Sequence, residues 1–396
     1  MLIHILKMVW NRKKSNALIV AEIAIAFLVV FSLTALALRN YQLYQTPLGF
    51  DYQNMWRVTI KPSAQWQPER DLVAVKQILS ELEKQPEVSR AHLLDNPTFL
   101  NWSWTSSYEL DGKIIRYTGN RFDDKAPETF GMTLLEGRWF GPQDSGQNYT
   151  PVLINKRFVD TFFPGENVIG KNIAEVNEKN PQERRVVGVF QDFRQMGELS
   201  KLTPYLFERL DIDSSSNRPL RGIELKMSPN TQIIFEEQMQ KIMKRIAPHW
   251  EFDIQTWESK RQTHIKETLL PITILAIVGC FLMVMVAMGL FGVLWQNVTA
   301  RTQEIGLRRA LGSTEKQIHT QIITELLVVS FFGVSIAALI LVQLPLLGVF
   351  SELNWSLFGS AFFIALVMMT LLSVICAFYP GKIATNYSPS EALHYE

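Results

Sequence analysis

Four long apolar runs organise this chain of 396 residues. Residues 269–300, 326–350 and 353–380 contain no Asp, Glu, Lys or Arg, and residues 15–38 contain only Glu22. A helix needs about 20 apolar residues to cross the hydrocarbon core of a bilayer, and each run is long enough. Helices buried in a soluble core rarely need runs of this length. The pattern therefore predicts four transmembrane helices, at 15–38, 269–297, 318–346 and 355–379.

Basic residues beside the short loops predict the orientation of these spans. Lys and Arg gather before the first span and again between the second and third, whereas the turn at 350–354 carries only Glu352. Lys382 follows the fourth span. Because positive charge is retained on the cytoplasmic side, we expect both termini in the cytoplasm and residues 39–268 outside it. Residues 1–14, apolar along one face, are expected to form an amphipathic helix on the inner leaflet.

The long polar segment between the first two spans contains both strand and helix patterns. Alternation with a period of two predicts strands, and a repeat of three to four residues predicts amphipathic helices. The order strand, helix, strand occurs near the start of the segment and again near its end, at 54–60, 69–85, 88–94 and at 222–227, 231–247, 251–257. Two such units predict a ferredoxin-like domain with an insertion between its halves. The fold class is therefore a membrane protein with four transmembrane α-helices and an α+β extracytoplasmic domain.

The insertion has the pattern of mostly β-structure. A hairpin is predicted about Asp111-Gly112, because this pair suits a tight turn. Residues 151–163 and 184–193 continue the strand pattern. The polar stretch 211–219 is expected to be a linker back to the second half of the ferredoxin-like part.

Aromatic and acidic residues of the extracytoplasmic segment have more than one possible role. Seven of the ten tryptophans lie in it, including Trp102 and Trp104. They would suit a surface for an amphipathic ligand or partner, but core packing is the more common role of such side chains. The paired carboxylates Asp123-Asp124 lie in loop-like sequence, and we expect them to be solvated turn residues rather than a catalytic pair.

Charge and rare residues argue against several classes of function. The formal net charge of +1 gives no indication of a nucleic-acid partner. Both cysteines, Cys280 and Cys376, fall inside predicted spans, so no disulfide is expected in the extracytoplasmic segment. Residues 165–172, GENVIGKN, resemble a phosphate-binding loop, but Asn172 replaces the hydroxyl residue and Pro164 abuts the loop. The histidines are scattered without metal-ligand spacing. We therefore expect no catalytic, cofactor or metal site.

A charged stretch, RTQEIGLRRALGS at 301–313, separates the second and third spans. On a helix, Arg301 would meet Glu304 three residues later, and Glu304 would meet Arg308 four residues later in the favourable order. Gly312 can adopt the left-handed conformation that ends a helix. The stretch is thus predicted to be a short independent helix at the cytoplasmic surface.

An apolar strip on the same helix indicates what it contacts. Leu307, Ala310 and Leu311 fall together on another face. A helix with small residues and an apolar strip suits docking against another protein, and the alternative is a headgroup anchor with arginines on lipid phosphates. Thr314 and Gln317 then form a capping box that opens the next helix.

The residues EIGLRRALGS are very similar to the cytoplasmic-loop signature of the FtsX-like permeases of the MacB type. That family typically has EIGIRRALGA, so this chain differs mildly at Leu307 and Ser313. Further likeness lies in FGMTLLEGRWF (130–140), PVLINKRFVDTFFPGENVIGK (151–171), VVGVFQDFR (186–194) and the C-terminal YPGKIATNYSPSEALHYE. By this resemblance, coupling to an ATPase is carried by Arg301, Glu304, Ile305, Gly306, Leu307, Arg308, Arg309, Ala310, Leu311 and Gly312.

The resemblance also implies a domain organisation. Residues 39–268 would form a periplasmic core domain and residues 269–396 an FtsX-like permease domain that includes a coupling helix at 301–312. Within the core domain, a porter-like subdomain would comprise 50–97 and 220–260, and the β-rich insertion would comprise 98–219.

For function, the resemblance implies a permease subunit of a MacB-type ABC exporter in the bacterial inner membrane. MacB fuses its ATPase ahead of the first span, and here about fourteen residues precede that span. We therefore expect a separate ATPase subunit that binds ATP and Mg²⁺, and no enzyme activity or cofactor on this chain. One FtsX-like unit is half a transporter, so a second copy or a paralogue is implied. Movement of the periplasmic domain would expel an amphipathic small molecule or peptide through a periplasmic adaptor and an outer-membrane channel.

Two other outputs share this architecture. A lipoprotein-releasing permease would act on lipid-anchored proteins. An FtsX-like regulator would relay ATPase motion to cell-wall hydrolases or a sensor kinase and transport nothing, although FtsX has a much smaller external domain than residues 39–268. The sequence leaves the cargo open.

Overall fold

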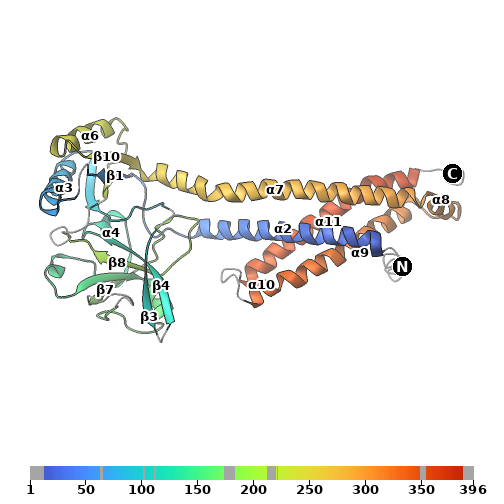
Figure 1. Cartoon of the computed structure of the whole chain (residues 1–396), viewed down its shortest axis with the longest axis horizontal. Coiled ribbons are helices and arrows are strands. Elements are labelled where there is room, and N and C mark those ends of the chain that lie inside the picture. Colours follow the sequence, from blue (N-terminus) through green and yellow to red (C-terminus); the bar gives the residue numbers. More distant parts are fainter. Residues whose placement is uncertain are drawn as a thin grey trace. The chain divides into compact units, whose positions relative to one another are not determined.

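The computed structural model divides into two compact units, which are described separately. The helical unit comprises Met1–Gln42 with Leu269–Glu396, and the α/β unit comprises Leu43–Thr268 (Figure 1). The structure describes residues 13–62, 66–100, 103–110, 113–173, 183–211, 220, 222–347 and 354–386. The expected amphipathic helix before residue 13, the Asp111-Gly112 turn and most of the expected 211–219 linker therefore lie outside the described residues.

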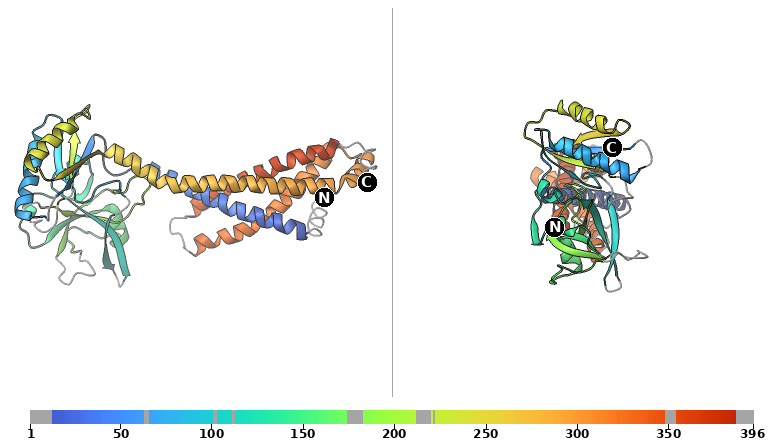
Figure 2. Two further views of the ribbon diagram at one scale, coloured as in Figure 1. Left: turned by 45° about the horizontal axis from the view of Figure 1, so that its top comes forward. Right: turned by 90° about the vertical axis from the view of Figure 1, so that its left-hand side faces the viewer.

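A four-stranded antiparallel sheet forms the first half of the α/β unit. Its strand order is β10-β1-β9-β2, with β1 Met55–Lys61, β2 Val88–Leu93, β9 Gly222–Met227 and β10 Glu251–Thr256. Helices α3 Pro68–Glu83 and α6 Phe235–Ile246 connect the strands and lie side by side (Figure 2). This order, with one strand–helix–strand unit at each end of the segment, confirms the predicted ferredoxin-like arrangement.

Helical periodicity explains how these two helices cover the sheet. Val75, Ile78 and Leu82 of α3 are fully buried, and Met239 and Met243 of α6 are buried with them. Spacings of three and four residues place each set on one helix face. Burial of such side chains stabilises the fold by about 1.5–3 kcal/mol each.

The inserted part contains a six-stranded mixed sheet. Its strand order is β3-β4-β8-β6-β7-β5, with β3 Trp104–Leu110, β4 Lys113–Phe122, β5 Leu134–Gly137, β6 Thr150–Asn155, β7 Arg184–Phe190 and β8 Tyr205–Arg209. β3 and β4 pair as the predicted antiparallel hairpin. Two pairs of strands are parallel: β4 pairs with β8, and β6 pairs with β7. Short helices α4 Ala126–Thr129 and η1 Pro142–Asp144 lie between the strands in sequence.

The prediction of continuous β-structure over 151–163 is wrong in its second half. The strand β6 ends at Asn155, and helix α5 occupies Lys156–Phe162. The Asn155 side chain accepts a hydrogen bond from the backbone N–H of Phe158, at 3.0 Å. Asparagine is favoured at the N-cap position because its side-chain oxygen accepts a hydrogen bond from one of the free N–H groups of the first turn. Sequence periodicity cannot distinguish a short buried helix from a short buried strand.

Most of the described tryptophans of the α/β unit support the core-packing interpretation. Trp56, Trp250 and Trp257 are at most 7% exposed, and Trp104 packs across the face of Gly119. Trp102 lies outside the described residues. The aromatic content of this unit therefore fills its interior.

Within the described ranges, four helices are long and apolar enough to cross a membrane. They are α2 Lys13–Gln45, α7 Trp257–Thr299, α9 Glu315–Leu341 and α11 Trp355–Asn386, with the single turn α10 Gln343–Leu346 after α9. Helix α7 begins well before the predicted span at 269, because residues 258–268 contain neither Gly nor Pro to end it. Both cysteines are free, and they lie on α7 and α11.

Small residues bring the helices of the helical unit close together. A Cβ placed on Gly333 of α9 would lie 2.8 Å from Ile23 of α2, and one on Gly289 of α7 would lie 2.6 Å from the Glu22 carboxylate. Such close approach is typical of packing in membranes, where small residues let backbones come together. Phe27 and Phe362 add an edge-to-face ring contact at 5.2 Å.

A buried ion pair of the four-stranded sheet contacts Trp257, the first residue of α7. Arg57 of β1 pairs with Glu224 of β9, and both side chains are at most 1% exposed. The indole N–H of Trp257 donates to the second carboxylate oxygen of Glu224 at 2.6 Å. Burial raises the pKa of Glu224, although the charge of Arg57 and the bond from Trp257 act to lower it. This cluster fixes the start of α7 to the sheet.

Removing one partner of this buried pair should destabilise the chain strongly. We expect Arg57→Met to lower the free energy of unfolding by about 3–5 kcal/mol, because it leaves the Glu224 carboxylate buried without its cation. Chemical denaturation of the purified chain in detergent, followed by tryptophan fluorescence, measures this change. The matched control is Arg90→Met, which breaks the exposed pair with Glu128 and should cost much less. Equal losses of unfolding free energy in the two variants would contradict a special role for the buried Arg57–Glu224 pair.

Candidate functional site

The stretch between the second and third membrane helices folds as a separate short helix. Helix α8 occupies Thr302–Ala310, between the end of α7 and the start of α9 (Figure 1). Gly312 lies two residues beyond its end, and its φ of 98° is in the left-handed region, which a glycine adopts without strain. Thr314 and Gln317 then form the predicted capping box: each side chain bonds the backbone N–H of the other residue, at 3.3 and 2.9 Å.

A chain of polar contacts ties α8 to α9. Arg308 donates to Glu304 at 2.5 Å, which confirms the predicted pair, and to Gln321 at 2.8 Å. Gln321 donates to Glu325 at 3.0 Å, and Glu325 accepts from Arg301 at 2.8 Å. The predicted Arg301–Glu304 pair is wrong, because Arg301 reaches Glu325 of the next helix. Both side chains of that longer-range pair are less than one fifth exposed.

The apolar side of α8 is open. Leu307 is 53% exposed and Leu311 is 79% exposed, and Ala310 is exposed as well. Gly306 is buried and Ile305 is half-buried, so they form the inward side of the helix. Helix α8 therefore presents apolar side chains outward, while its charged residues Glu304 and Arg308 are paired within the chain.

Of Arg309, the structure describes only the backbone, which belongs to α8. Gln321 and Glu325 were missed by sequence reasoning, although a signal exists. They lie four residues apart on α9, and Glu325 is the last charge before the apolar run of the third span. Polar residues at the end of a span often pair with a neighbouring helix.

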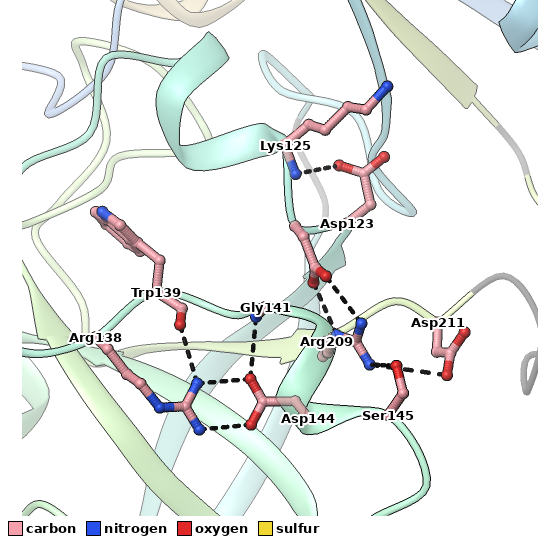
Figure 3. Close-up of polar contacts among 10 residues, drawn as sticks. Asp123, Lys125, Arg138, Trp139, Gly141, Asp144, Ser145, Arg209 and Asp211 are labelled. Atoms are coloured by element: carbon pink, nitrogen blue, oxygen red, sulfur yellow. Dashed lines mark hydrogen bonds and ion pairs between the residues drawn. The ribbon is translucent and has the colours of Figure 1, made fainter.

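A second polar cluster lies in the α/β unit (Figure 3). Arg209 makes a two-pronged pair with Asp124, at 2.7 and 2.8 Å, and donates to Ser145 at 3.0 Å. Arg138 makes a similar pair with Asp144, with both contacts at 2.6 Å. Two-pronged Arg–carboxylate pairs combine directionality with charge, and here they join the loops around the six-stranded sheet.

Asp123 also differs from the solvated turn residue that the sequence predicts. Its carboxylate accepts from the backbone N–H of Leu93 at 2.8 Å and of Lys125 at 3.1 Å. Burial raises the pKa of Asp123 to about 7, and these two bonds only partly oppose the effect. Since Leu93 belongs to β2, Asp123 joins the inserted part to the four-stranded sheet.

Stability should therefore depend on pH through Asp123. Its pKa in the folded chain is about 7, against an ordinary 3.8, so the folded state holds the proton more tightly. The resulting stabilisation is present at acid pH and is lost as pH rises from about 4 to about 7. Asp123→Asn should flatten this part of the curve of unfolding free energy against pH, measured by denaturation at each pH. Superimposable curves for the two proteins would refute the prediction.

The loop resembling a phosphate-binding motif has no free lysine. Lys171 pairs with Glu166 and lies over the Phe163 ring at 4.8 Å. The loop follows helix α5 rather than a strand, whereas a phosphate-binding loop follows a strand. Among the described residues, no group of three His, Cys, Asp or Glu side chains could hold a metal ion.

Comparison with protein families matches two regions of the chain. Residues 17–240 match the MacB-like periplasmic core domain, and residues 276–389 match the FtsX-like permease C-terminal domain. Together they define the membrane component of an ABC transporter. The first match covers more than half of the chain, and the chain belongs to the MacB-like family of FtsX-like permeases. It is a multi-pass protein of the inner membrane with a periplasmic domain.

Individual relatives agree with this family. The chain is 26% identical over 275 residues to the macrolide export ATP-binding/permease protein MacB of Mannheimia succiniciproducens, a match that covers 67% of this chain and 41% of the relative. A protein of the same name from Bdellovibrio bacteriovorus is 26% identical over 314 residues, covering 76% of this chain and 45% of the relative. The chain thus spans less than half the length of these curated relatives.

Among solved structures, the periplasmic region of MacB from Actinobacillus actinomycetemcomitans is similar. It is 16% identical, with a TM-score of 0.38, and the match covers 56% of this chain and 97% of that one. Neither matched family region of the present chain is a nucleotide-binding domain.

Proposed function

We propose that this chain is the permease subunit of a MacB-type exporter driven by mechanical transmission. A separate ABC ATPase binds ATP and Mg²⁺, docks on α8 and moves it, and the movement passes through the membrane helices to the periplasmic domain. The observation that carries this proposal is the division of α8 into an open apolar side and a charged side that is bonded to α9.

The two sides of α8 suit two different tasks. The apolar side supplies docking energy, because burying Leu307 and Leu311 against a partner contributes about 1.5–3 kcal/mol each. The charged side holds the helix to α9 through Arg301 and Arg308, so a displacement of α8 is carried to α9 by side chains as well as by the connecting backbone. A mere headgroup anchor would instead leave the arginines free for lipid phosphates.

The composition of the spans favours transmission over a polar conduit. Residues 269–300, 326–350 and 353–380 contain no Asp, Glu, Lys or Arg, and residues 15–38 contain only Glu22, which leaves few charged side chains to line a pathway. Cargo is therefore taken up on the periplasmic side. In this proposal it is an amphipathic small molecule or peptide, handed to a periplasmic adaptor and an outer-membrane channel.

The orientation of the chain and its number of copies are also part of the proposal. The basic residues beside the short loops support a cytoplasmic location for both termini and for α8, on the side where ATP is found. A second copy or a paralogue completes the transporter, so that two ATPase subunits dock on two α8 helices.

A measurement of ATP hydrolysis tests directly whether the ATPase activity belongs to a separate subunit. The chain reconstituted alone in lipid nanodiscs should hydrolyse no ATP above the lipid control, because neither matched region is a nucleotide-binding domain. Addition of an ABC ATPase subunit from the same organism should give hydrolysis that depends on the chain. ATP turnover by the chain alone, or no ATPase subunit whose rate responds to the chain, would overturn the proposal.

The apolar side of α8 should govern docking of that ATPase. We expect Leu307→Asp with Leu311→Asp to weaken binding at least about 100-fold, since the loss of two buried leucines corresponds to about 3–6 kcal/mol. Binding is measured by titrating the ATPase onto nanodiscs that contain the chain. The matched control, Leu307→Met with Leu311→Met, keeps the side apolar and should bind normally. Unchanged binding by the aspartate variant would exclude α8 as the docking helix.

A further inference from the structure

One loop of the α/β unit holds the ends of two helices at once. This clamp loop, Arg194–Ser200, lies between β7 and β8 in sequence. The Arg194 side chain is 1% exposed. Its Nη1 donates to the carbonyl oxygens of Leu43 at 2.9 Å and Thr46 at 2.7 Å. These carbonyls lie at the C-terminal end of α2, where a helix leaves its last carbonyl groups without partners.

The same guanidinium also gives the clamp loop its shape. Nη2 donates to the carbonyl of Ser200 at 2.6 Å and to that of Glu198, and Nε donates to Ser200 at 3.2 Å. The backbone N–H of Gly197 donates back to the Arg194 carbonyl at 2.9 Å, with Gly197 in the left-handed region at a φ of 85°. Loop and helix end therefore share one buried cation, and neither can shift without breaking its bonds.

The other side of the clamp loop holds α7. The Glu198 carboxylate pairs with Arg261 of α7, and these side chains are 7% and 14% exposed. The Arg261 guanidinium lies over the Tyr52 ring at 4.7 Å. His264, one turn further along α7, packs against Gly197. Buried and hydrogen-bonded pairs of this kind resist separation far more than exposed pairs do.

Both helices held in this way continue into candidate membrane spans. α2 and α7 each run without a break between the α/β unit and the helical unit. The clamp loop also connects directly to the six-stranded sheet, since β7 and β8 both pair with β6. A displacement of either helix along its axis therefore acts on this loop, and the loop acts on the sheet.

We propose that the clamp loop is the element through which movement of the first two spans reaches the periplasmic domain. Arg194, Glu198 and Arg261 are positioning residues for this step, and the step rests on the proposed export function. Arginine is needed at position 194 because its fork of donors serves carbonyls of α2 and of the loop together, whereas a lysine ammonium is a single point of charge.

The first test uses the purified full chain in nanodiscs, without an ATPase. Glu198→Gln weakens the contact between the clamp loop and α7. The Glu198 side chain does not touch α2, so this variant should loosen the end of α2 only if the loop joins the two helices. Hydrogen exchange of the amides from Leu43 to Thr46 should rise at least about tenfold. The matched control is Glu258→Gln, which also removes a partner of Arg261 but lies on α7 itself, and it should leave this exchange unchanged. Unchanged exchange in Glu198→Gln, or an equal rise in the control, would overturn the clamp.

The second test uses the reconstituted complex with its ABC ATPase. Glu198→Gln and Arg194→Lys should retain nucleotide-dependent ATP hydrolysis, because α8 is untouched, but should lose the change in exchange of β7 and β8 amides on trapping ATP. A variant that keeps this change would refute the clamp. Failure of the wild-type chain to respond to any ATPase would instead refute the proposed function and leave the result of the first test standing.

Discussion

The hydrocarbon core of a bilayer excludes unpaired charge, and this constraint decides where the chain places its strongest polar contacts. The spans are held by apolar packing and close approach at Gly289 and Gly333. The ion pairs that the structure describes beside these spans lie near helix ends. Arg301 meets Glu325 where α9 begins its apolar course, and Arg261 meets Glu198 near the start of α7. The apolar membrane helices are therefore joined to neighbouring elements by ion pairs near their ends, and these contacts are called polar joints below.

Such an arrangement suits the transmission of force better than the passage of a solute. A helix is stiff along its axis because each turn is hydrogen-bonded to the next. The joints at its ends are directional, since each relies on a guanidinium with fixed donor geometry. At one end the joint leaves Leu307 and Leu311 open for a partner, and at the other the clamp loop leads into the six-stranded sheet. In the proposed function, docking, transmission and response thus belong to different parts of the chain.

Local patterns predicted much of this structure, and contacts between distant residues could not be predicted. The spans, the ferredoxin-like strand order, the Glu304–Arg308 pair and the Thr314–Gln317 capping box all depend on periodicities or spacings of a few residues. Arg301 pairs with Glu325, and Arg194 binds the end of α2, so both contacts join residues far apart in sequence. The position of Glu325 at the edge of a span suggests that it has a partner, but a single sequence does not say which residue that partner is. The helix α5 was missed because a short buried run fits either period, and the Asn155 cap decided the outcome.

The most direct test of the account is a distance measurement within the periplasmic domain. Spin labels at Val73 on α3 and Ile114 on β4, both well exposed, report separately on the four-stranded and six-stranded sheets. Double electron–electron resonance on the chain reconstituted with its ABC ATPase compares the nucleotide-free complex with the complex in which ATP is trapped. The account predicts a shift in the distance distribution when ATP is trapped. Identical distributions in a complex that hydrolyses ATP would contradict it.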